Sequence, residues 1–211
     1  MRNNSDLKTM FREAGILFGI TLLAGLLLGL VYEVTKEPRR IQQEKAVQEA
    51  CVAVFPQAEE ESLELTFTPV ENGPAELIAE LAEQSVKIGT VFRAEHGGVL
   101  YGYVVETACK GYGGDVVLYV GVGADGTVNG VSITESSETP GLGLEASAVL
   151  TPQFAGKKVE SFVYTKAGAM ENTNEVDAIS GATITTRAVT DAVNGGLKVA
   201  LELVGGGVYN E

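Results

Sequence analysis

The stretch that decides the fold is residues 91–134, VFRAEHGGVLYGYVVETACKGYGGDVVLYVGVGADGTVNGVSIT. Apolar and polar residues alternate with period two in four segments, which is typical of half-buried strands: 91–95, 99–107, 115–122 and 127–134. Gly97-Gly98 and Ala124-Asp125-Gly126 are turn signals between such segments. Consecutive strands joined by tight turns form antiparallel hairpins, so the sequence predicts a sheet as the core.

Helical patterns flank this sheet. A strand at 63–68 and a short helix at 75–84 precede it, and a further strand is predicted at 159–165. Apolar residues then recur at four-residue steps through the segment 184–204, which predicts an amphipathic helix packed on the sheet: Val189, Val193, Leu197 and Leu201. Hairpins with helices before and after them indicate an α+β domain rather than a wound parallel sheet.

An uncharged run of 19 residues, Ala14 to Tyr32, lies near the N-terminus. As a helix it would span about 28 Å, one bilayer crossing. It runs into Glu33 without a small-x-small cleavage site, which favours a retained anchor over a signal peptide. Cationic residues flank both ends, so charge alone leaves the orientation open. We expect four parts: a head at 1–13, a transmembrane helix at 14–32, a stalk helix at 33–58 that Pro56 ends, and a soluble domain at 59–211.

Composition excludes several classes of function. The formal net charge is −13, and residues 41–211 hold nine Lys and Arg against 24 Asp and Glu, about −15 by difference. Such a domain repels nucleic-acid phosphates and anionic lipid, so no nucleic acid is expected as a partner. One His and two Cys cannot make a zinc site or a four-cysteine iron–sulfur cluster. Two buried free thiols are favoured for Cys51 and Cys109, although the sequence leaves their pairing open.

Two motifs favour ordinary structure over chemistry. Residues 121–126, GVGADG, match the dinucleotide fingerprint GxGxxG, but they lie between two alternating segments and no helix follows them. A hairpin turn is the better interpretation. His96 lies in a Glu-His-Gly-Gly turn without a second His or a nucleophile partner, and we interpret it as a surface residue.

The segment 177–183, DAISGAT, comes directly before the predicted C-terminal helix. A helix N-terminus presents unpaired N–H groups and the positive end of the helix dipole, and both suit a phosphate. Gly181 and Ala182 leave space for a bulky group to approach the backbone. From the residues alone, Ser180 or Thr183 can equally be the N-cap that any helix uses, and the two interpretations stay open.

The pattern Asp-x-x-Ser-Gly-Ala-Thr followed by Ile-Thr-Thr resembles the flavinylation motif of the FMN-binding domain family. Members include the G subunit of the Rnf ion-translocating electron transport complex and the C subunit of the Na⁺-translocating NADH:quinone reductase. In that family a dedicated transferase, with FAD as donor, attaches FMN through a phosphoester bond to the last Thr of the motif. The resemblance implies covalent FMN on Thr183. It also implies a flavin site that includes Asp177, Ser180, Gly181, Ala182 and Thr186.

Three further segments extend the resemblance. Residues 138–143, ETPGLG, are similar to a family turn that lies against the flavin, which implies contacts from Glu138, Thr139, Gly141, Leu142 and Gly143. Lys110 and Tyr112 belong to a Lys-Gly-Tyr-Gly segment of the family, and Lys166 resembles a lysine that approaches the flavin. A Lys near the isoalloxazine would stabilise its anionic reduced form. Without the resemblance, these would be an ordinary turn and solvated strand-end lysines.

The resemblance implies a redox subunit that is not catalytic alone and has no catalytic or metal-binding residues. Thr183 is then a tether. Electrons would pass between ferredoxin and NAD, the partners would be other membrane proteins of the complex and the flavin transferase, and residues 33–211 would face away from the cytoplasm. The compact length favours the Rnf complex over the quinone reductase. Alternatives are the quinone reductase, a cofactor-free membrane-tethered binding domain, and a stand-alone extracellular electron carrier.

Overall fold

The computed structural model describes residues 4–71, 73–170 and 173–206. The helices are α1 (Asn4–Ala53), α2 (Pro56–Glu60), α3 (Ala75–Glu83), the 3₁₀ turn η1 (Gly143–Glu145), α4 (Ala146–Val149), α5 (Thr151–Phe154) and α6 (Thr183–Gly206). The strands are β1 (Thr66–Pro69), β2 (Val86–His96), β3 (Val99–Lys110), β4 (Asp115–Gly123), β5 (Val128–Glu135), β6 (Val163–Thr165) and β7 (Glu175–Asp177). The predicted α+β class is confirmed.

Five strands form one antiparallel sheet in the order β1-β2-β3-β4-β5. The hairpins predicted from periodicity are therefore confirmed. Gly97 and Gly98 turn the chain between β2 and β3 with φ of +57° and +81°, values that glycine adopts without steric cost. The fingerprint-like segment 121–126 ends β4 and turns into β5, so it is a hairpin turn. His96 is the exposed last residue of β2, and its Nδ1 lies 3.1 Å from the Glu64 carbonyl oxygen.

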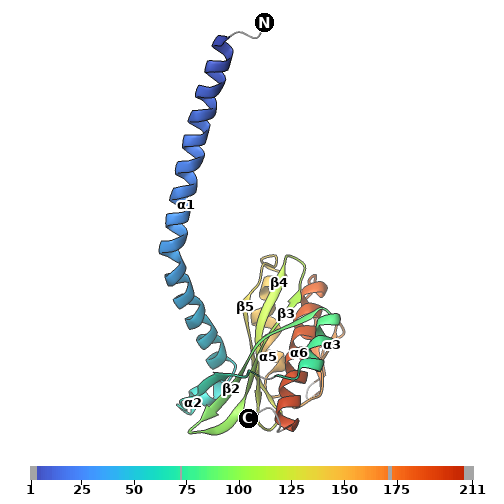
Figure 1. The fold of residues 1–211 in the computed structure, drawn as a ribbon. Helices are drawn as coiled ribbons and strands as arrows, with labels where there is room; N and C mark the ends of the chain where they lie inside the picture. The colour runs from blue at the N-terminus through green and yellow to red at the C-terminus, as the bar shows by residue number, and fades with distance from the viewer. Residues whose placement is uncertain (1–3, 72, 171–172, 207–211) are drawn as a thin grey trace. The chain divides into compact units, whose positions relative to one another are not determined.

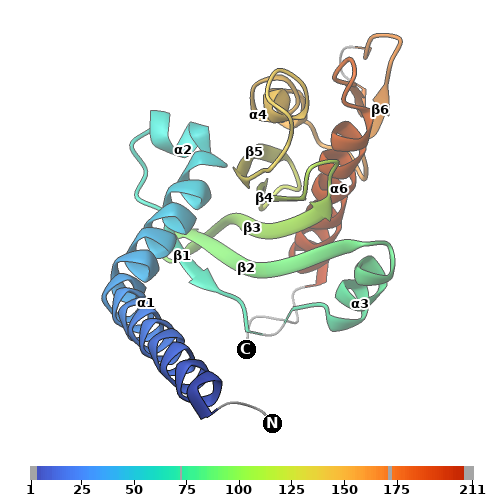
Figure 2. The ribbon, with the colours of Figure 1, turned by 90° about the horizontal axis from the view of Figure 1, so that it is seen from above.

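Successive residues of the central strands point to opposite faces of the sheet, and each face carries its own apolar cluster. Tyr103 and Val105 of β3 pack in the larger cluster, which contains Val189, Val193 and Leu197 of α6. Val104 and Tyr119 point the other way and pack with Val54, Phe55 and the last residues of α1. Figures 1 and 2 show α6 on one face of the sheet and the end of α1 with α2 on the other. The large apolar area that α6 buries fixes the position of its N-terminus.

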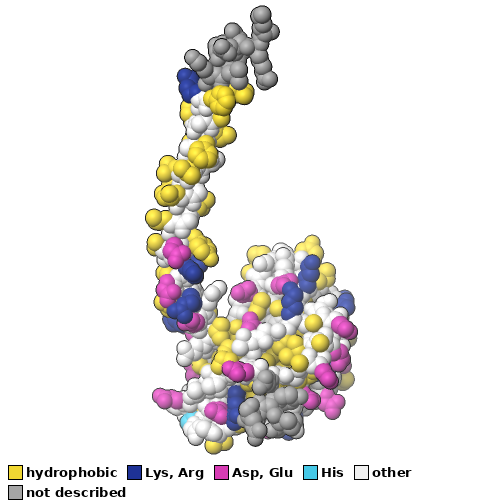
Figure 3. Space-filling model, in the orientation of Figure 1, with side chains coloured by type: hydrophobic (Ala, Val, Ile, Leu, Met, Phe, Trp, Pro, Cys, Tyr) yellow, Lys and Arg dark blue, Asp and Glu magenta, His cyan; other side chains and the backbone are white. Residues whose placement is uncertain are grey.

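The N-terminal helix is long and apolar. Residues 1–46 form a compact unit of their own, separate from the unit that begins at Val47. Figure 3 shows hydrophobic side chains along α1 between a cation near its start and mixed charges further on. These side chains are exposed, and the helix is long and apolar enough to cross a membrane by length and composition.

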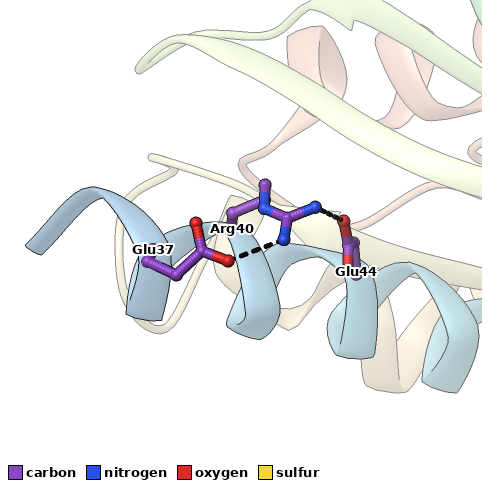
Figure 4. A network of polar contacts seen from close by, with 3 residues as sticks. All are labelled: Glu37, Arg40 and Glu44. Atoms are coloured by element: carbon purple, nitrogen blue, oxygen red, sulfur yellow. Dashed lines mark hydrogen bonds and ion pairs between the residues drawn. The ribbon is translucent and has the colours of Figure 1, made fainter.

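The helix α1 continues through Pro38, which has no N–H to donate to the carbonyl four residues earlier. A polar network flanks this gap, as Figure 4 shows. The Arg40 guanidinium lies 2.7 Å from Glu37 and 3.0 Å from Glu44 on the same face of the helix. The two carboxylates raise the pKa of Arg40. Pairs at three- and four-residue spacing favour the helical backbone on both sides of the proline.

Two strands are shorter than the sequence predicts, each because of hydrogen bonds that its first residues make outside the sheet. The strand predicted at 63–68 begins at Thr66, since the Leu63 N–H donates to the Ala58 carbonyl and closes α2. The strand predicted at 159–165 is only β6, which pairs in parallel with β7. The side-chain amide of Asn194 on α6 bonds both backbone groups of Phe162, with N···O distances of 2.7 and 2.9 Å, and so keeps that residue out of a ladder.

The prediction that Pro56 ends the stalk helix is wrong. Helix α1 ends earlier, at Ala53, and Pro56 is the first residue of α2. Proline suits this position because the first N–H of a helix has no partner within it.

The two cysteines are free and buried, on opposite faces of the sheet. Burial raises the pKa of Cys51 and of Cys109 to about 12. We predict that neither thiol reacts with iodoacetamide at pH 8, because roughly one molecule in ten thousand would carry a thiolate there. Mass spectrometry should find no adduct on the folded protein and two after denaturation. An adduct on the folded chain would contradict the burial of that thiol.

Gly121 of β4 gives a stability test. A Cβ at this position would lie 2.7 Å from the Val54 carbonyl oxygen, and the backbone cannot move aside as a side chain can. We predict that Gly121→Ala lowers the free energy of unfolding by about 1–3 kcal/mol. Gly205→Ala is the control, since nothing lies near its Cβ. Thermal unfolding followed by near-ultraviolet circular dichroism measures both, and equal melting temperatures for the two variants would refute the close packing.

Candidate functional site

A pocket of about 560 Å³ lies where three chain segments meet: the β3–β4 turn, the turn after β5, and the start of α6. Its volume falls in the range of small-molecule sites, roughly 300–1,000 Å³. The residues that line it are Tyr112, Glu138, Thr139, Leu142, Gly143, Gly181, Ala182, Thr183, Ile184 and Thr185.

The Glu138 side chain joins the three segments. It is 6% exposed, and its two oxygens accept hydrogen bonds from different parts of the chain. Oε1 accepts the backbone N–H of Gly113 at 2.9 Å, and Oε2 accepts the hydroxyl of Thr185 at 2.5 Å. A buried carboxylate is stable only when its oxygens are paired in this way. The pocket walls are therefore held in place by one acidic side chain.

Two glycines are required by the close approach to this carboxylate. A Cβ on Gly111 would overlap Glu138 Oε1. A Cβ on Gly143 would lie 2.5 Å from both Glu138 Oε2 and the Thr185 hydroxyl, far below van der Waals contact. The glycines of both turns therefore allow Glu138 to reach its partners.

Three threonines in the first turn of α6 differ in the state of their hydroxyls. Thr185 is 1% exposed and donates to Glu138, as described above. Thr186 is fully buried, donates to the Ala182 carbonyl at 2.9 Å and accepts the Ile179 N–H at 3.1 Å. Thr183 is partly exposed and lines the pocket, and its hydroxyl has no hydrogen-bond partner within the described part of the chain. It is the threonine of this turn whose hydroxyl is free to react.

The position at which α6 begins tests whether Thr183 is simply the N-cap of the helix. The helix begins at Thr183, so this residue is its first helical position and not the N-cap. Gly181 turns the chain just before it with φ of +77°, and the Ala182 N–H donates to the Ile179 carbonyl at 3.1 Å. The N–H groups of the first turn have no partners within the helix and lie at the positive end of its dipole.

Eight of the fourteen residues predicted for the site line the pocket, and six do not: Lys110, Gly141, Lys166, Asp177, Ser180 and Thr186. Gly141 and Ser180 are exposed in the adjoining turns, and Thr186 lies beneath the pocket in the core. Ile184 and Thr185 line the pocket, although the sequence did not predict them. Helical periodicity is the signal that could have found Thr185, since it places a residue of this turn against the sheet.

Asp177 does not line the pocket and instead makes hydrogen bonds with neighbouring segments of the chain. It ends β7, and its Oδ1 accepts the Ala169 N–H at 2.6 Å. Its own N–H donates to Gln153 of α5 at 2.6 Å. The acid of the motif therefore orders the loop after β6 and the chain that leads to α6.

The two predicted lysines are exposed at strand ends. Lys110 ends β3 opposite Asp115, and Lys166 follows β6. Asp115 forms its ion pair with Lys87 at 2.8 Å, and this ammonium lowers the pKa of the Asp115 carboxyl.

A known protein family and individual relatives are similar in sequence to this region. A family model described as FMN-binding domain covers residues 111–198, which include every residue that lines the pocket. The G subunit of the Na⁺-translocating ferredoxin:NAD⁺ oxidoreductase complex of Acetobacterium woodii is 37% identical over 199 residues, 92% of this chain and 93% of that protein. The chain belongs to this G-subunit family of FMN-binding domain proteins. A further member, the G subunit of the ion-translocating oxidoreductase complex of Methanosarcina acetivorans, is 31% identical over 90% of this chain and 94% of that protein.

A solved structure shares the fold. The C subunit of the Na⁺-translocating NADH-quinone reductase from Parabacteroides distasonis superposes with a TM-score of 0.56 at 23% identity, over 79% of this chain and 95% of that one. The antiparallel sheet with its terminal helix is therefore common to the G-subunit family and this second group of proteins.

The Glu138–Thr185 hydrogen bond gives a test of how the site is held together. We predict that Thr185→Val lowers the free energy of unfolding by about 1–3 kcal/mol, because it leaves a buried carboxylate oxygen without its donor. Thr183→Val makes the same change two residues away at a free hydroxyl and should stay within about 0.5 kcal/mol of the parent. Denaturant unfolding of both variants measures the difference. Equal losses would show that Glu138 does not depend on Thr185.

Proposed function

We propose that this chain is the covalently flavinylated, electron-carrying G subunit of a membrane-bound ion-translocating ferredoxin:NAD oxidoreductase complex, with FMN attached to Thr183. The observation that carries the proposal is that Thr183 lines a pocket of about 560 Å³ and that its hydroxyl has no hydrogen-bond partner among the described residues. The neighbouring threonines are buried and bonded. A free hydroxyl is what a group-transfer reaction needs.

Attachment requires an activating enzyme. An aliphatic hydroxyl is a poor nucleophile unless a base removes its proton. The only His of the chain lies at the end of β2, and Glu138 bonds Thr185 rather than Thr183. A flavin transferase with FAD as donor would form the bond between Thr183 Oγ and the FMN phosphorus. The pyrophosphate bond of FAD breaks, AMP leaves, and the hydroxyl proton passes to a base of the transferase.

The pocket walls suit a flavin. Tyr112, Leu142 and Ile184 are 73%, 40% and 54% exposed, and a planar ring system can pack against their side chains. A flavin supplies one- and two-electron chemistry, and the protein supplies its position. Glu138 holds the β3–β4 turn and the start of α6 around the cofactor. Asp177 and Ser180 present the attachment segment to the transferase, and Lys110 and Lys166 add positive charge near the site.

Membrane attachment follows from α1. Residues 14–32 form the transmembrane part, residues 1–13 lie in the cytoplasm, and the stalk at 33–58 leads to an extracytoplasmic domain at 59–211. A covalent tether fits this side of the membrane, because a dissociating cofactor would be lost from the cell. No ionisable side chain lies within 14–31, so ion movement belongs to the partner proteins of the complex. The chain is 37% and 31% identical to two G subunits over nearly its full length, which favours this complex over the quinone reductase.

Production of the full chain together with a flavin transferase tests the proposal. We expect a fluorescent flavin band after denaturing electrophoresis, and an intact mass raised by one FMN residue. Thr183→Ala should abolish both signals, since the other threonine hydroxyls of this turn are buried and bonded, while Ser180→Ala should keep them. A colourless protein of unmodified mass would leave a cofactor-free tethered domain, and a flavin that persists in Thr183→Ala would move the attachment to another residue.

A further inference from the structure

The pocket that receives the flavin lacks a counter-ion for a phosphate. Among the residues that line it, all of which the structure describes, there is no Lys, Arg or His. Its titratable side chains are Tyr112 and Glu138. A helix N-terminus can bind a phosphate through its N–H groups and dipole, and cationic side chains strengthen such a site. Here the helix terminus is present and the cations are replaced by a carboxylate.

That carboxylate lies beside the first turn of α6, where it accepts a side-chain hydroxyl and not an N–H group of the helix. Glu138 is bonded to Thr185, the third residue of the helix, so its charge lies at the positive end of the dipole. Both of its oxygens accept hydrogen bonds, as those of an ionised carboxylate do. The helix terminus is worth about half a positive charge, whereas the carboxylate carries a full negative one. The net charge that a phosphate meets is therefore negative.

The cations of the neighbouring segments do not line the pocket. Arg187, one turn further along α6, pairs with Asp191 at 3.6 Å, and Lys87 pairs with Asp115 at 2.8 Å. Lys110 and Lys166 are exposed and do not line the pocket. Solvent-exposed charges at such positions are screened by salt, while a buried charge such as that of Glu138 is screened much less.

From this arrangement we infer that Glu138 is a specificity-determining residue that makes the pocket reject free FMN while it accepts the uncharged flavin moiety. The inference rests on the proposed function for the identity of the ligand. A phosphate monoester carries about 1.5 to 2 negative charges at neutral pH, whereas a phosphate esterified to Thr183 carries one and cannot leave. The pocket is thus suited to the flavin of an FMN whose phosphate is already bonded to Thr183. Free FMN does not occupy the pocket before that bond forms.

The experiment uses the full chain in detergent, produced without a transferase and therefore unmodified. Riboflavin and FMN are titrated separately, and binding is followed by the flavin fluorescence and by equilibrium dialysis. The two probes share the ring system and differ in the phosphate. We expect riboflavin to bind at least about ten-fold more tightly than FMN at low salt.

Two variants assign the discrimination to charge. Glu138→Gln keeps the size of the side chain and removes its charge, and should bring the two dissociation constants within about three-fold of each other. Ile184→Lys leaves Glu138 in place and adds a cation at a pocket residue that is 54% exposed, so it should raise the affinity for FMN relative to that for riboflavin about ten-fold, whatever packing both probes lose. Val99→Lys, in the distant β2–β3 hairpin and 72% exposed, adds the same charge and should change neither constant.

Each result decides the inference. Equal or tighter binding of FMN by the parent chain, a ratio that folded Glu138→Gln leaves unchanged, or no riboflavin binding at all would overturn it. If Glu138→Gln does not fold, a ratio that Ile184→Lys leaves unchanged would overturn it instead. These titrations do not depend on covalent attachment. If the transferase leaves the chain unmodified while riboflavin still binds in preference to FMN, the proposed tether fails and the selectivity of the pocket stands.

Discussion

The buried carboxylate of Glu138 is the interaction on which the site depends. It accepts one hydrogen bond from the turn between β3 and β4 and one from the first turn of α6, and it comes from a third segment after β5. Its burial would be costly without these partners. Residues 111 and 143 are glycines in this geometry because any side chain there would collide with it. A single acidic residue thus requires glycine in two turns and holds the hydroxyl of Thr185 in a hydrogen bond.

The sheet and α6 make this arrangement rigid. Val189, Val193 and Leu197 pack into the larger core cluster, and Asn194 bonds both backbone groups of Phe162. The helix cannot slide without the loss of these contacts, so its first turn stays against the pocket. The opposite face of the sheet is covered by the end of α1 and by α2, which buries the apolar side chains that link these two helices. The site is therefore built at one edge of a well-packed domain.

The chemistry of the site favours covalent attachment of FMN over noncovalent binding. Its walls are apolar and hydroxyl-bearing, Thr183 is the threonine with a free hydroxyl in the first turn of α6, and the buried charge of the pocket has the same sign as a phosphate. A phosphate held without a covalent bond gains from cations beside it, and none of the described residues that line this pocket is a cation. The covalent bond proposed at Thr183 would remove the need for cations and would let the protein surround the flavin with groups that position it. This is consistent with an electron carrier whose cofactor must not be exchanged.

The sequence by itself determined the hairpins of the sheet, the terminal helix, the apolar N-terminal segment and the segment that precedes α6, because each depends on patterns among neighbouring residues. Only the tertiary structure decided which of Thr183, Thr185 and Thr186 has a free hydroxyl, and that Lys110 and Lys166 stay outside the pocket. The physical reason is the large sequence separation between the residues that form the deciding hydrogen bonds. Glu138 meets Gly113 across 25 residues and Thr185 across 47, and the Asn194 bonds that shorten β6 span 32. Hydrogen bonds over such separations leave no periodic trace in the chain, so the folded structure is needed to find them.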